Sequence, residues 1–358
     1  MAVSKLSSVR LTGIACAVPE QIRTLADDAK VFSVEEVNKV SFSTGVKQRH
    51  VVTDLCTSDL CFAAAEELIQ EGAVAKASID ALVFVSQTPD YILPATSCCL
   101  HERLGLSKDC ASFDINLGCS GYVYGLWVVA NMIASGSIQR ALLLVGDTIS
   151  KITSPEDRSV ALLFGDAGSA TLLERDAEAP EITFVLGTDG TGQSNLKVPA
   201  GGFRKQWSSE TAKRTEREGG NSRAETDLYM NGAEVFTFTL GSVPRLIKSL
   251  LAECGQSVEG IDAFVFHQAN RFMLQHLTKK MKIPSEKVLL GMSQFGNTSS
   301  ASIPLAMTTH LADRARNETL HLVLAGFGVG YSWAGAYLQS KGLIVPDLIF
   351  VPEDPEAD

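Results

Sequence analysis

The sequence predicts an α/β protein built from two related halves, and three observations lead to this fold class. Short apolar runs rich in Val, Leu and Phe alternate with longer amphipathic runs along the chain, which is the pattern of sheets covered by helices. A segment that begins at Ile79 is repeated at Ile261. The chain of 358 residues is also long enough for two domains of about 150 to 200 residues each.

The repeat extends over two strands and a helix. "IDALVFVSQ" from Ile79 corresponds to "IDAFVFHQA" from Ile261, and "NLGCSGYVYGL" from Asn116 corresponds to "QFGNTSSASIP" from Gln294. The run "ALLLVGD" then corresponds to "LHLVLAGFG". Three elements in one order, at an offset of about 180 residues, indicate an internal duplication into halves 1–180 and 181–358. Such halves are expected to pack sheet to helix to sheet, with a site where their strand ends meet.

The N-terminal half is predicted to begin with a strand and a turn, because its first apolar stretch is interrupted by Gly13 and closed by Pro19. This interruption also argues against a signal peptide. Periodicity predicts helices over 57–71 and 120–135, and strands over 81–85, 112–115 and 141–145.

The C-terminal half follows the same alternation. Helices are predicted over 231–253, 271–282 and 302–314, and strands over 263–266 and 321–325.

Two segments stand outside the repeat. Residues 201–226 are rich in charge, Gly and Ser, which predicts a solvated flexible loop, with a lid or a partner contact as the alternative. The tail over 341–358 has one apolar strand-like run and then acidic residues around prolines, and we expect its end to be frayed.

Composition narrows the classes of function. The formal net charge of -10 disfavours a nucleic-acid binder, which needs clustered Lys and Arg. The longest apolar run, 122–134, contains Gly and Asn and is too short to span a bilayer. The eight cysteines have neither CxxC pairs nor zinc spacing, which is typical of reduced thiols. These features predict a cytoplasmic protein with no membrane span.

Cys119 is a candidate nucleophile because of its place in the chain. It lies between a predicted strand and a predicted helix, where free N–H groups and the helix dipole favour a thiolate. Gly118 and Gly121 are expected to leave room for a bound thioester. The alternative is that Cys119 is a small buried apolar residue, as most free cysteines are.

His267 and Asn297 are predicted to join Cys119. His267 ends the second copy of the repeated strand, where the first copy has Val85, and Asn297 occupies the turn that corresponds to Cys119. Each residue alone is typical of a structural role. A pseudo-twofold axis would bring the three together, and imidazole is the usual partner of a catalytic Cys. The glycine-rich turn over 325–335 would let a backbone N–H approach a substrate oxygen.

Five motifs in order resemble the β-ketoacyl-ACP synthase III family of the thiolase superfamily, where ACP is the acyl carrier protein. They are "DINLGCSGYVYGL", "SPEDRSVALLFGDAGSATLLE", "HQAN", "GNTSSASIPLA" and "AGFGVGYSWAG", and the resemblance runs from about residue 10 to residue 340. It implies a five-layered α/β/α/β/α fold, a homodimer, and no metal or redox cofactor.

The resemblance also implies an acyltransferase activity and its residues. Cys119 would be acylated by an acyl-CoA or acyl-ACP, while His267 and Asn297 would promote decarboxylation of malonyl-ACP and stabilise the enolate. The backbone N–H groups of Cys119 and Val329 would form the oxyanion hole. The implied reaction is a decarboxylative Claisen condensation in fatty acid or related lipid or polyketide biosynthesis.

Substrate and carrier contacts are implied in the same way. Arg158, Leu93 and Phe327 would contact substrate, with Leu93 closing the acyl pocket of a partner subunit, and the basic residues Arg271, Lys279 and Lys280 would contact the acidic carrier protein.

The chain also departs from the family pattern. Lys39 and Ser43 stand where the priming enzymes have a Trp that stacks on the CoA adenine and an Arg, which favours an ACP-borne or unusual primer. Leu93 replaces an aromatic, which indicates a larger or differently shaped acyl group.

Two other functions stay open at this point. One is a specialised acyltransferase of secondary metabolism or surface-polysaccharide assembly that forms an ester or amide, which the altered adenine site and the long 201–226 segment favour. The other is a non-catalytic partner subunit of a heterodimeric condensing enzyme, which the presence of Cys119, His267 and Asn297 disfavours.

Overall fold

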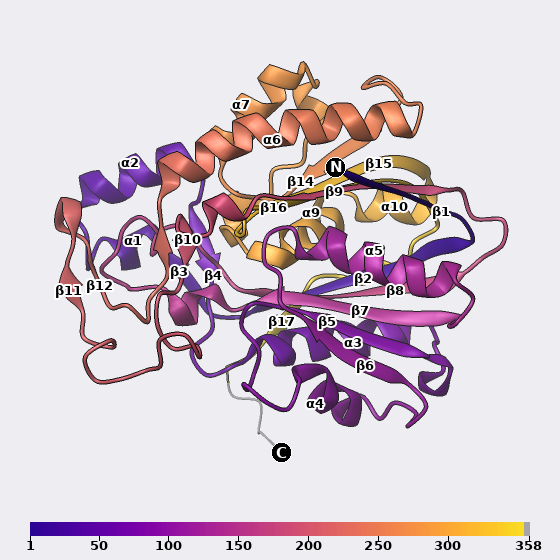
Figure 1. Ribbon diagram of the computed structural model, residues 1–358, viewed down its shortest axis with the longest axis horizontal. Coiled ribbons are helices and arrows are strands. Elements are labelled where there is room, and N and C mark those ends of the chain that lie inside the picture. The colour runs from indigo at the N-terminus through magenta and orange to yellow at the C-terminus, as the bar shows by residue number, and fades with distance from the viewer. Residues whose placement is uncertain (354–358) are drawn as a thin grey trace.

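Two stacked sheets form the framework of the computed structural model, which describes residues 1–353 (Figure 1). The expected frayed end of the tail, 354–358, lies outside the described residues. The first sheet has the order β17-β2-β8-β7-β5-β6. Its strands are β2 (Val9–Pro19), β5 (Ala81–Val85), β6 (Ala111–Ile115), β7 (Arg140–Asp147), β8 (Ala167–Arg175) and β17 (Ile349–Val351).

The second sheet has the order β1-β9-β16-β15-β14. Its strands are β1 (Ala2–Leu6), β9 (Ile182–Thr188), β14 (Ala263–Phe266), β15 (Thr319–Gly328) and β16 (Ser332–Lys341). In the first sheet β7 pairs parallel with β5 and antiparallel with β8, and in the second β15 pairs parallel with β14 and antiparallel with β16. The predicted duplication is therefore confirmed by topology.

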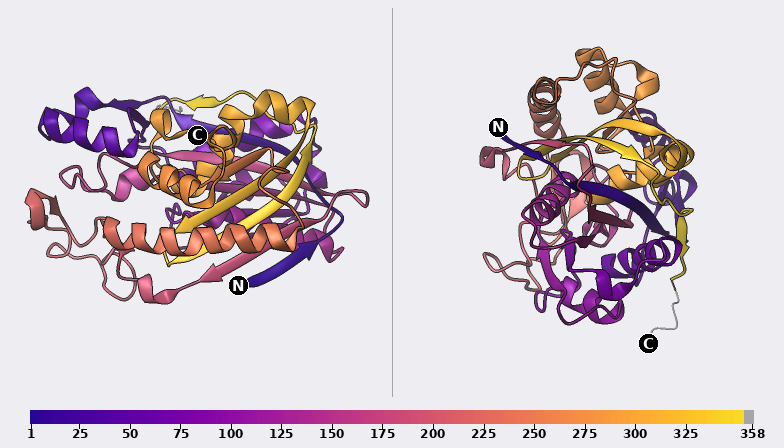
Figure 2. Two further views of the ribbon diagram at one scale, coloured as in Figure 1. Left: turned by 90° about the horizontal axis from the view of Figure 1, so that it is seen from above. Right: turned by 90° about the vertical axis from the view of Figure 1, so that its right-hand side faces the viewer.

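Helices form the other three layers, and the five-layered order is confirmed (Figures 1 and 2). α5 (Gly121–Ala134) and α9 (Ser302–His310) contact strands of both sheets. α3 (Thr57–Glu71) and α4 (Thr96–Arg103) cover the outer face of the first sheet, and α6 (Gly232–Glu253) and α7 (Arg271–Met281) lie on the far side of the second. α5 is apolar on most of its surface because both sheets pack against it.

The two halves exchange edge strands. β1, from the start of the chain, pairs with β9 of the second sheet, and β17, from the tail, pairs with β2 of the first sheet. The strand-like run predicted in the tail is thus a sheet edge. Each sheet contains strands from both sides of residue 180.

Among the described residues, α6 is the one helix that is long and apolar enough to cross a membrane. Its apolar side packs on β16, β9 and β15, as the core helix of a folded domain does. The helix predicted over 302–314 is divided: α9 ends at His310 and α10 (Ala312–Asn317) follows, with Leu311 between them at φ -122°.

Shorter elements surround the end of the molecule where the strands of both halves terminate. The segment predicted as a loop, 201–226, carries the hairpin β11–β12, and the ladder β10–β13 brackets the segment. These elements are β3 (Ile22–Thr24), α1 (Leu25–Asp28), α2 (Val34–Thr44), β4 (Gln48–His50), β10 (Leu196–Lys197), β11 (Thr215–Glu216), β12 (Ser222–Arg223), β13 (Tyr229–Met230) and α8 (Met292–Phe295).

Candidate active site

The three predicted residues Cys119, His267 and Asn297 meet at a fourth, Ser299. Cys119 precedes α5, His267 follows β14, and Asn297 lies between α8 and α9. The Cys119 Sγ lies 3.9 Å from the Ser299 Oγ, and the Ser299 N–H donates to the Asn297 Oδ1 at 2.9 Å. The backbone carbonyl of Ser299 accepts from the Ser302 hydroxyl at 2.8 Å, and that hydroxyl lies 2.7 Å from the His267 Nδ1, so His267 reaches Ser299 through Ser302.

Ser299 has a strained backbone, with φ at +49°. This left-handed conformation is uncommon for a residue with a side chain and costs on the order of 1 kcal/mol. The Asn297 carboxamide, as acceptor of the Ser299 N–H, holds the turn in place. No pattern in the sequence singled out Ser299, because its role depends on contacts between the two halves.

Cys119 lines a cavity of about 310 Å³. Its side chain is buried, and the end of β15 crosses so close that a Cβ on Gly328 would lie 2.8 Å from the sulfur. The cavity is lined by Gln87, Asn116, Cys119, Ile149, Ile152, Phe164, Leu196, Lys197, Val198, Leu228, Ser299 and Val329.

The space beside Gly118 and Gly121 is filled by the protein itself. A Cβ on Gly118 would lie 2.6 Å from the Gln87 Cδ, and a Cβ on Gly121 would lie 2.8 Å from the Val85 Cγ1. The expectation that these glycines leave room for a bound thioester is therefore wrong. They allow a side chain and a strand to approach the turn closely.

Burial raises the pKa of the Cys119 thiol to about 11. The backbone N–H of Val329, the Ser299 hydroxyl and the N–H of Cys119 itself act in the opposite direction, while the charge of Asp147 adds to the increase. The expected lowering of this pKa is wrong, because desolvation of a buried thiolate outweighs the hydrogen bonds that favour it. At neutral pH the group is a thiol, so attack on a substrate requires a proton acceptor.

His267 is a neutral imidazole at neutral pH, because burial lowers its pKa to about 4. Its Nδ1 lies 2.7 Å from the Ser302 Oγ, which also lies 2.8 Å from the Ser299 carbonyl oxygen. When the Ser302 hydroxyl donates to that carbonyl, Nδ1 carries the imidazole hydrogen and Nε2 is free to accept a proton. When it donates to Nδ1, Nε2 carries the hydrogen and becomes a donor.

Asp147 joins three segments of the site through a fully buried carboxylate. Its Oδ1 accepts from the Gln87 N–H at 2.7 Å and the Ser86 hydroxyl at 3.2 Å. Its Oδ2 accepts from the Ser300 N–H at 3.1 Å and the Ser300 hydroxyl at 2.6 Å. The end of β7 is thereby tied to the end of β5 and to the turn before α9.

Sequence reasoning missed Asp147, although a signal was present. The strand pairing makes Ala141 the counterpart of Leu322, so Asp147 stands where the other copy has Gly328, next to Phe327. Phe327 is buried and packs edge-to-face on His267, with ring centroids 5.7 Å apart. A carboxyl group gained at a strand end is the same kind of signal that singled out His267.

Arg158 is occupied by other parts of the protein. Its guanidinium forms an ion pair with Glu36 of α2 and donates to the Gly219 carbonyl at 2.7 Å. Lys39 and Ser43 are exposed on the same helix. None of these three residues lines the Cys119 cavity.

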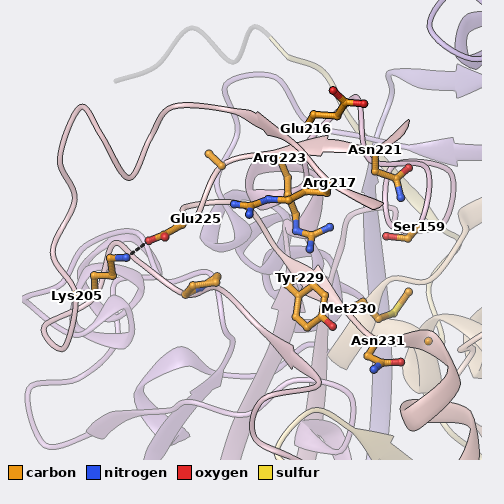
Figure 3. Close-up of a pocket in the computed structure, with 13 residues that line it drawn as sticks. Ser159, Lys205, Glu216, Arg217, Asn221, Arg223, Glu225, Tyr229, Met230 and Asn231 are labelled. Atoms are coloured by element: carbon orange, nitrogen blue, oxygen red, sulfur yellow. Dashed lines mark ion pairs between the residues drawn. The ribbon is translucent and has the colours of Figure 1, made fainter. Parts of the chain in front are cut away.

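A second, polar cavity of about 930 Å³ lies beside the 201–226 segment (Figure 3). Leu196 and Lys197 of β10 line the Cys119 cavity, while Tyr229 and Met230 of β13 line the polar one, so the β10–β13 ladder lies between them. The polar cavity is lined by Ser159, Pro199, Lys205, Glu216, Arg217, Asn221, Arg223, Ala224, Glu225, Tyr229, Met230, Asn231 and Gly232.

The other implied contacts lie away from Cys119. Arg271 donates to the Phe42 carbonyl and places its guanidinium 5.8 Å from the centre of the Phe42 ring, which ties α7 to α2. Lys279 and Lys280 are exposed on α7, and the Lys280 ammonium donates to the Leu240 carbonyl at 2.8 Å. Leu93 is 79% exposed and lies in the segment before α4.

Comparison with known proteins places these features in a family. The models "3-Oxoacyl-[acyl-carrier-protein (ACP)] synthase III" and its C-terminal counterpart match residues 113–190 and 251–340. The chain is 32% identical over 334 residues to a β-ketoacyl-[acyl-carrier-protein] synthase III of Desulfitobacterium hafniense, which covers 93% of this chain and 98% of the relative.

Solved structures agree. The crystal structure of a 3-oxoacyl-(acyl-carrier protein) synthase from Burkholderia xenovorans has a TM-score of 0.93 and 44% identity, covering 98% of this chain and 99% of that one. The priming β-ketosynthase of the R1128 polyketide pathway has a TM-score of 0.80 and 25% identity, covering 97% and 99%.

The raised pKa of Cys119 predicts how its alkylation depends on pH. With a pKa of about 11, labelling by iodoacetamide should rise about tenfold per pH unit from pH 7.5 to 9.5, because the thiolate fraction does. Peptide mass spectrometry would follow Cys119, with the exposed Cys98 as internal reference for the reagent. A plateau below pH 8.5 would contradict this.

Replacement of Asp147 should loosen the site. Asp147→Ala leaves the Gln87 and Ser300 N–H groups without their acceptor, and each unsatisfied buried donor costs about 1 to 3 kcal/mol. The free energy of unfolding in urea should fall by that order. Asp80→Ala is the matched control, because the Asp80 carboxylate accepts from the Gln139 and Arg140 N–H groups in the same manner at the opposite end of β7.

The two variants differ in their effect on Cys119. Asp147→Ala should change the alkylation profile of Cys119, since it removes the anchor of the Ser300 turn and a negative charge near the sulfur. Asp80→Ala should leave that profile as it is. Equal profiles in the two variants would show that Asp147 does not position the site.

Proposed function

This chain belongs to the β-ketoacyl-ACP synthase III family, and from that premise we propose that it condenses an acyl thioester with malonyl-ACP through an acyl-Cys119 intermediate. The observation that carries the proposal is the convergence of Cys119, His267 and Asn297 on the turn of Ser299 and Ser302, where Cys119 and Ser299 line one cavity. Nucleophile, imidazole and carboxamide are the groups that acyl transfer followed by enolate formation requires.

In the first half-reaction, the Cys119 sulfur attacks the thioester carbonyl of the acyl donor. Nε2 of His267 accepts the thiol proton in the arrangement where Ser302 donates to the Ser299 carbonyl. The N–H groups of Cys119 and Val329, both of which favour negative charge on the sulfur, stabilise the tetrahedral oxyanion. The bond to the leaving thiol then breaks, and that thiolate takes the proton from His267.

In the second half-reaction, malonyl-ACP loses carbon dioxide and its enolate attacks the acyl group. The enolate oxygen accepts from Nε2–H of His267 in the other arrangement of Ser302, and from Nδ2–H of Asn297. Among the described residues, Nδ2 of Asn297 makes only a long 3.5 Å hydrogen bond, to the Ala269 carbonyl. The new carbon–carbon bond forms as the bond to the Cys119 sulfur breaks, and the released thiolate takes a proton from water.

The donor and the carrier protein are part of the proposal. Arg158 is held by Glu36 and the Gly219 carbonyl, which supports an ACP-borne primer over CoA. Arg271, Lys279 and Lys280 on α7 offer positive charge to an acidic carrier protein. The enzyme would act in the cytosol, in fatty acid or polyketide synthesis.

A homodimer would complete the acyl pocket. β6 is an edge strand of the first sheet, and its buried Ser112 hydroxyl has no partner among the described residues. The nearby side chains of Tyr91, Ile92 and Leu93 are all more than half exposed. Association along β6 would cover these groups and carry Leu93 toward the partner's cavity.

Acylation is the first test. Incubated with acyl-ACP, the protein should gain the mass of one acyl group at Cys119, and Cys119→Ala should gain none. Intact-mass spectrometry measures both, and Cys98→Ala is the matched control. An adduct that persists in Cys119→Ala would remove this residue from the mechanism.

Variants of the two hydrogen-bond donors, Asn297 and His267, should separate the two half-reactions. Asn297→Ala should lower carbon dioxide release from malonyl-ACP about 100- to 1000-fold, as loss of an oxyanion donor does, with little effect on acylation. His267→Ala should slow both steps, because the imidazole serves in both. Turnover without release of carbon dioxide would instead identify the ester- or amide-forming acyltransferase.

The lowered pKa of His267 predicts that the rate of decarboxylation does not change with pH in the mildly acid range. Below its pKa of about 4 the imidazole is protonated, and above it the neutral ring dominates. Malonyl-ACP decarboxylation by Cys119→Ala, which lacks the thiol, should therefore stay flat from pH 5.5 to 7. An acid limb at the ordinary His value of about 6.5 would contradict this assignment.

A further inference from the structure

The side chain of Gln87 lies in the Cys119 cavity and is not used by the mechanism above. Gln87 follows the end of β5 and lines the cavity together with Cys119. Its backbone is fixed, because its N–H donates to the buried Asp147 carboxylate at 2.7 Å. The cavity wall therefore presents a carboxamide from a rigid point of the sheet.

Gly118 lets this carboxamide reach the turn that carries the nucleophile. A Cβ at Gly118 would lie 2.6 Å from the Gln87 Cδ and closer still to its Oε1, and 3.0 Å from the Val329 Cγ1. Any residue larger than glycine would displace the amide. The group thus lies against the residue before Cys119 and close to Val329, beside the expected position of the reacting carbonyl.

The Gln87 carboxamide has unused hydrogen-bonding capacity. Among residues 1–353 its side chain has no hydrogen-bond partner, although a carboxamide offers two N–H donors and one acceptor oxygen. Much of the surrounding wall is apolar, with Ile149, Ile152, Phe164, Leu196, Leu228 and Val329. An unsubstituted alkanoyl chain would fill this space and cover the amide without satisfying it, which is unfavourable.

We propose that Gln87 is a specificity-determining residue that selects acyl groups with a hydroxyl or oxo oxygen near the thioester. The inference rests on the proposed function and names its substrate class. Asn116, at the end of β6, lines the same cavity and offers a second carboxamide from the neighbouring strand. The cavity of about 310 Å³ is at the small end for ligand sites, so the preferred chain is short.

The expected selectivity follows from the cost of an unpaired amide. A site built to hydrogen-bond a substrate hydroxyl rejects the analogue that lacks it, because the site's polar group is then left buried without a partner. Wild-type protein should therefore be acylated at Cys119 at least about tenfold faster by 3-hydroxybutyryl-ACP than by butyryl-ACP. The two donors differ by one oxygen, so they share chain length and carrier.

The test compares these two donors on wild-type protein, Gln87→Met and Gln70→Met. Methionine keeps the length of glutamine and removes its hydrogen bonds. Gln87→Met should reduce the ratio of hydroxybutyryl to butyryl acylation rates about 10- to 100-fold. Gln70, exposed near the end of α3, is the matched control and should keep the wild-type ratio. Initial rates of the Cys119 adduct are read by intact mass.

Each outcome either supports or overturns the role of Gln87 in substrate selection. A wild-type preference that Gln87→Met removes supports the inference. Equal rates for both donors in wild-type protein, or an equal loss of both in Gln87→Met, would overturn it while leaving the condensing function intact. Labelling by neither donor nor by other acyl-ACPs would overturn the proposed function itself. If Gln87→Met does not fold, Gln87→Leu and the wild-type ratio provide the same comparison.

Discussion

The buried carboxylate of Asp147 is the interaction on which the site depends. Burial alone would make a charge here costly by several kcal/mol, and it raises the pKa of this carboxyl. The carboxylate persists because four donors from two other segments surround it. The same contacts bring the end of β5 to the end of β7 and to the turn that carries Ser299. The Cys119 thiol, the His267 imidazole and the Asn297 carboxamide are assembled around this anchor.

The duplication places two equivalent turns at the candidate site, and the two turns carry different side chains. One turn carries the Cys119 thiol and its counterpart carries the Asn297 carboxamide. Likewise His267 stands opposite Val85, and Asp147 stands opposite Gly328. Each half therefore contributes side chains that the other half lacks. The candidate site is asymmetric, although the framework around it is pseudo-symmetric. Ser299 links the two sets, because its hydroxyl lies beside Cys119, its N–H donates to Asn297 and its carbonyl accepts from the Ser302 hydroxyl that also contacts His267.

Periodicity predicted some elements to the residue because local pattern decides them: α3, β5 and β14 begin and end where expected. Short helices such as α2 and α4 were not predicted, and the pairing of β1 and β17 joins segments far apart in the chain. At the site, the repeat identified Cys119 and Asn297, but Ser299, Asp147 and Gln87 act through tertiary contacts. The direction of the Cys119 pKa was missed for the same reason, since depth of burial is set by the whole fold.

The exchanged edge strands make the two halves inseparable during synthesis. Because β17 forms the edge beside β2, the first sheet stays one strand short until residues 349–351 have left the ribosome. Neither half completes its sheet alone, and a chain that stopped before β17 would leave the β2 edge unpaired, which invites aggregation. The two copies of the repeat are therefore joined into one folding unit by the strands they exchange.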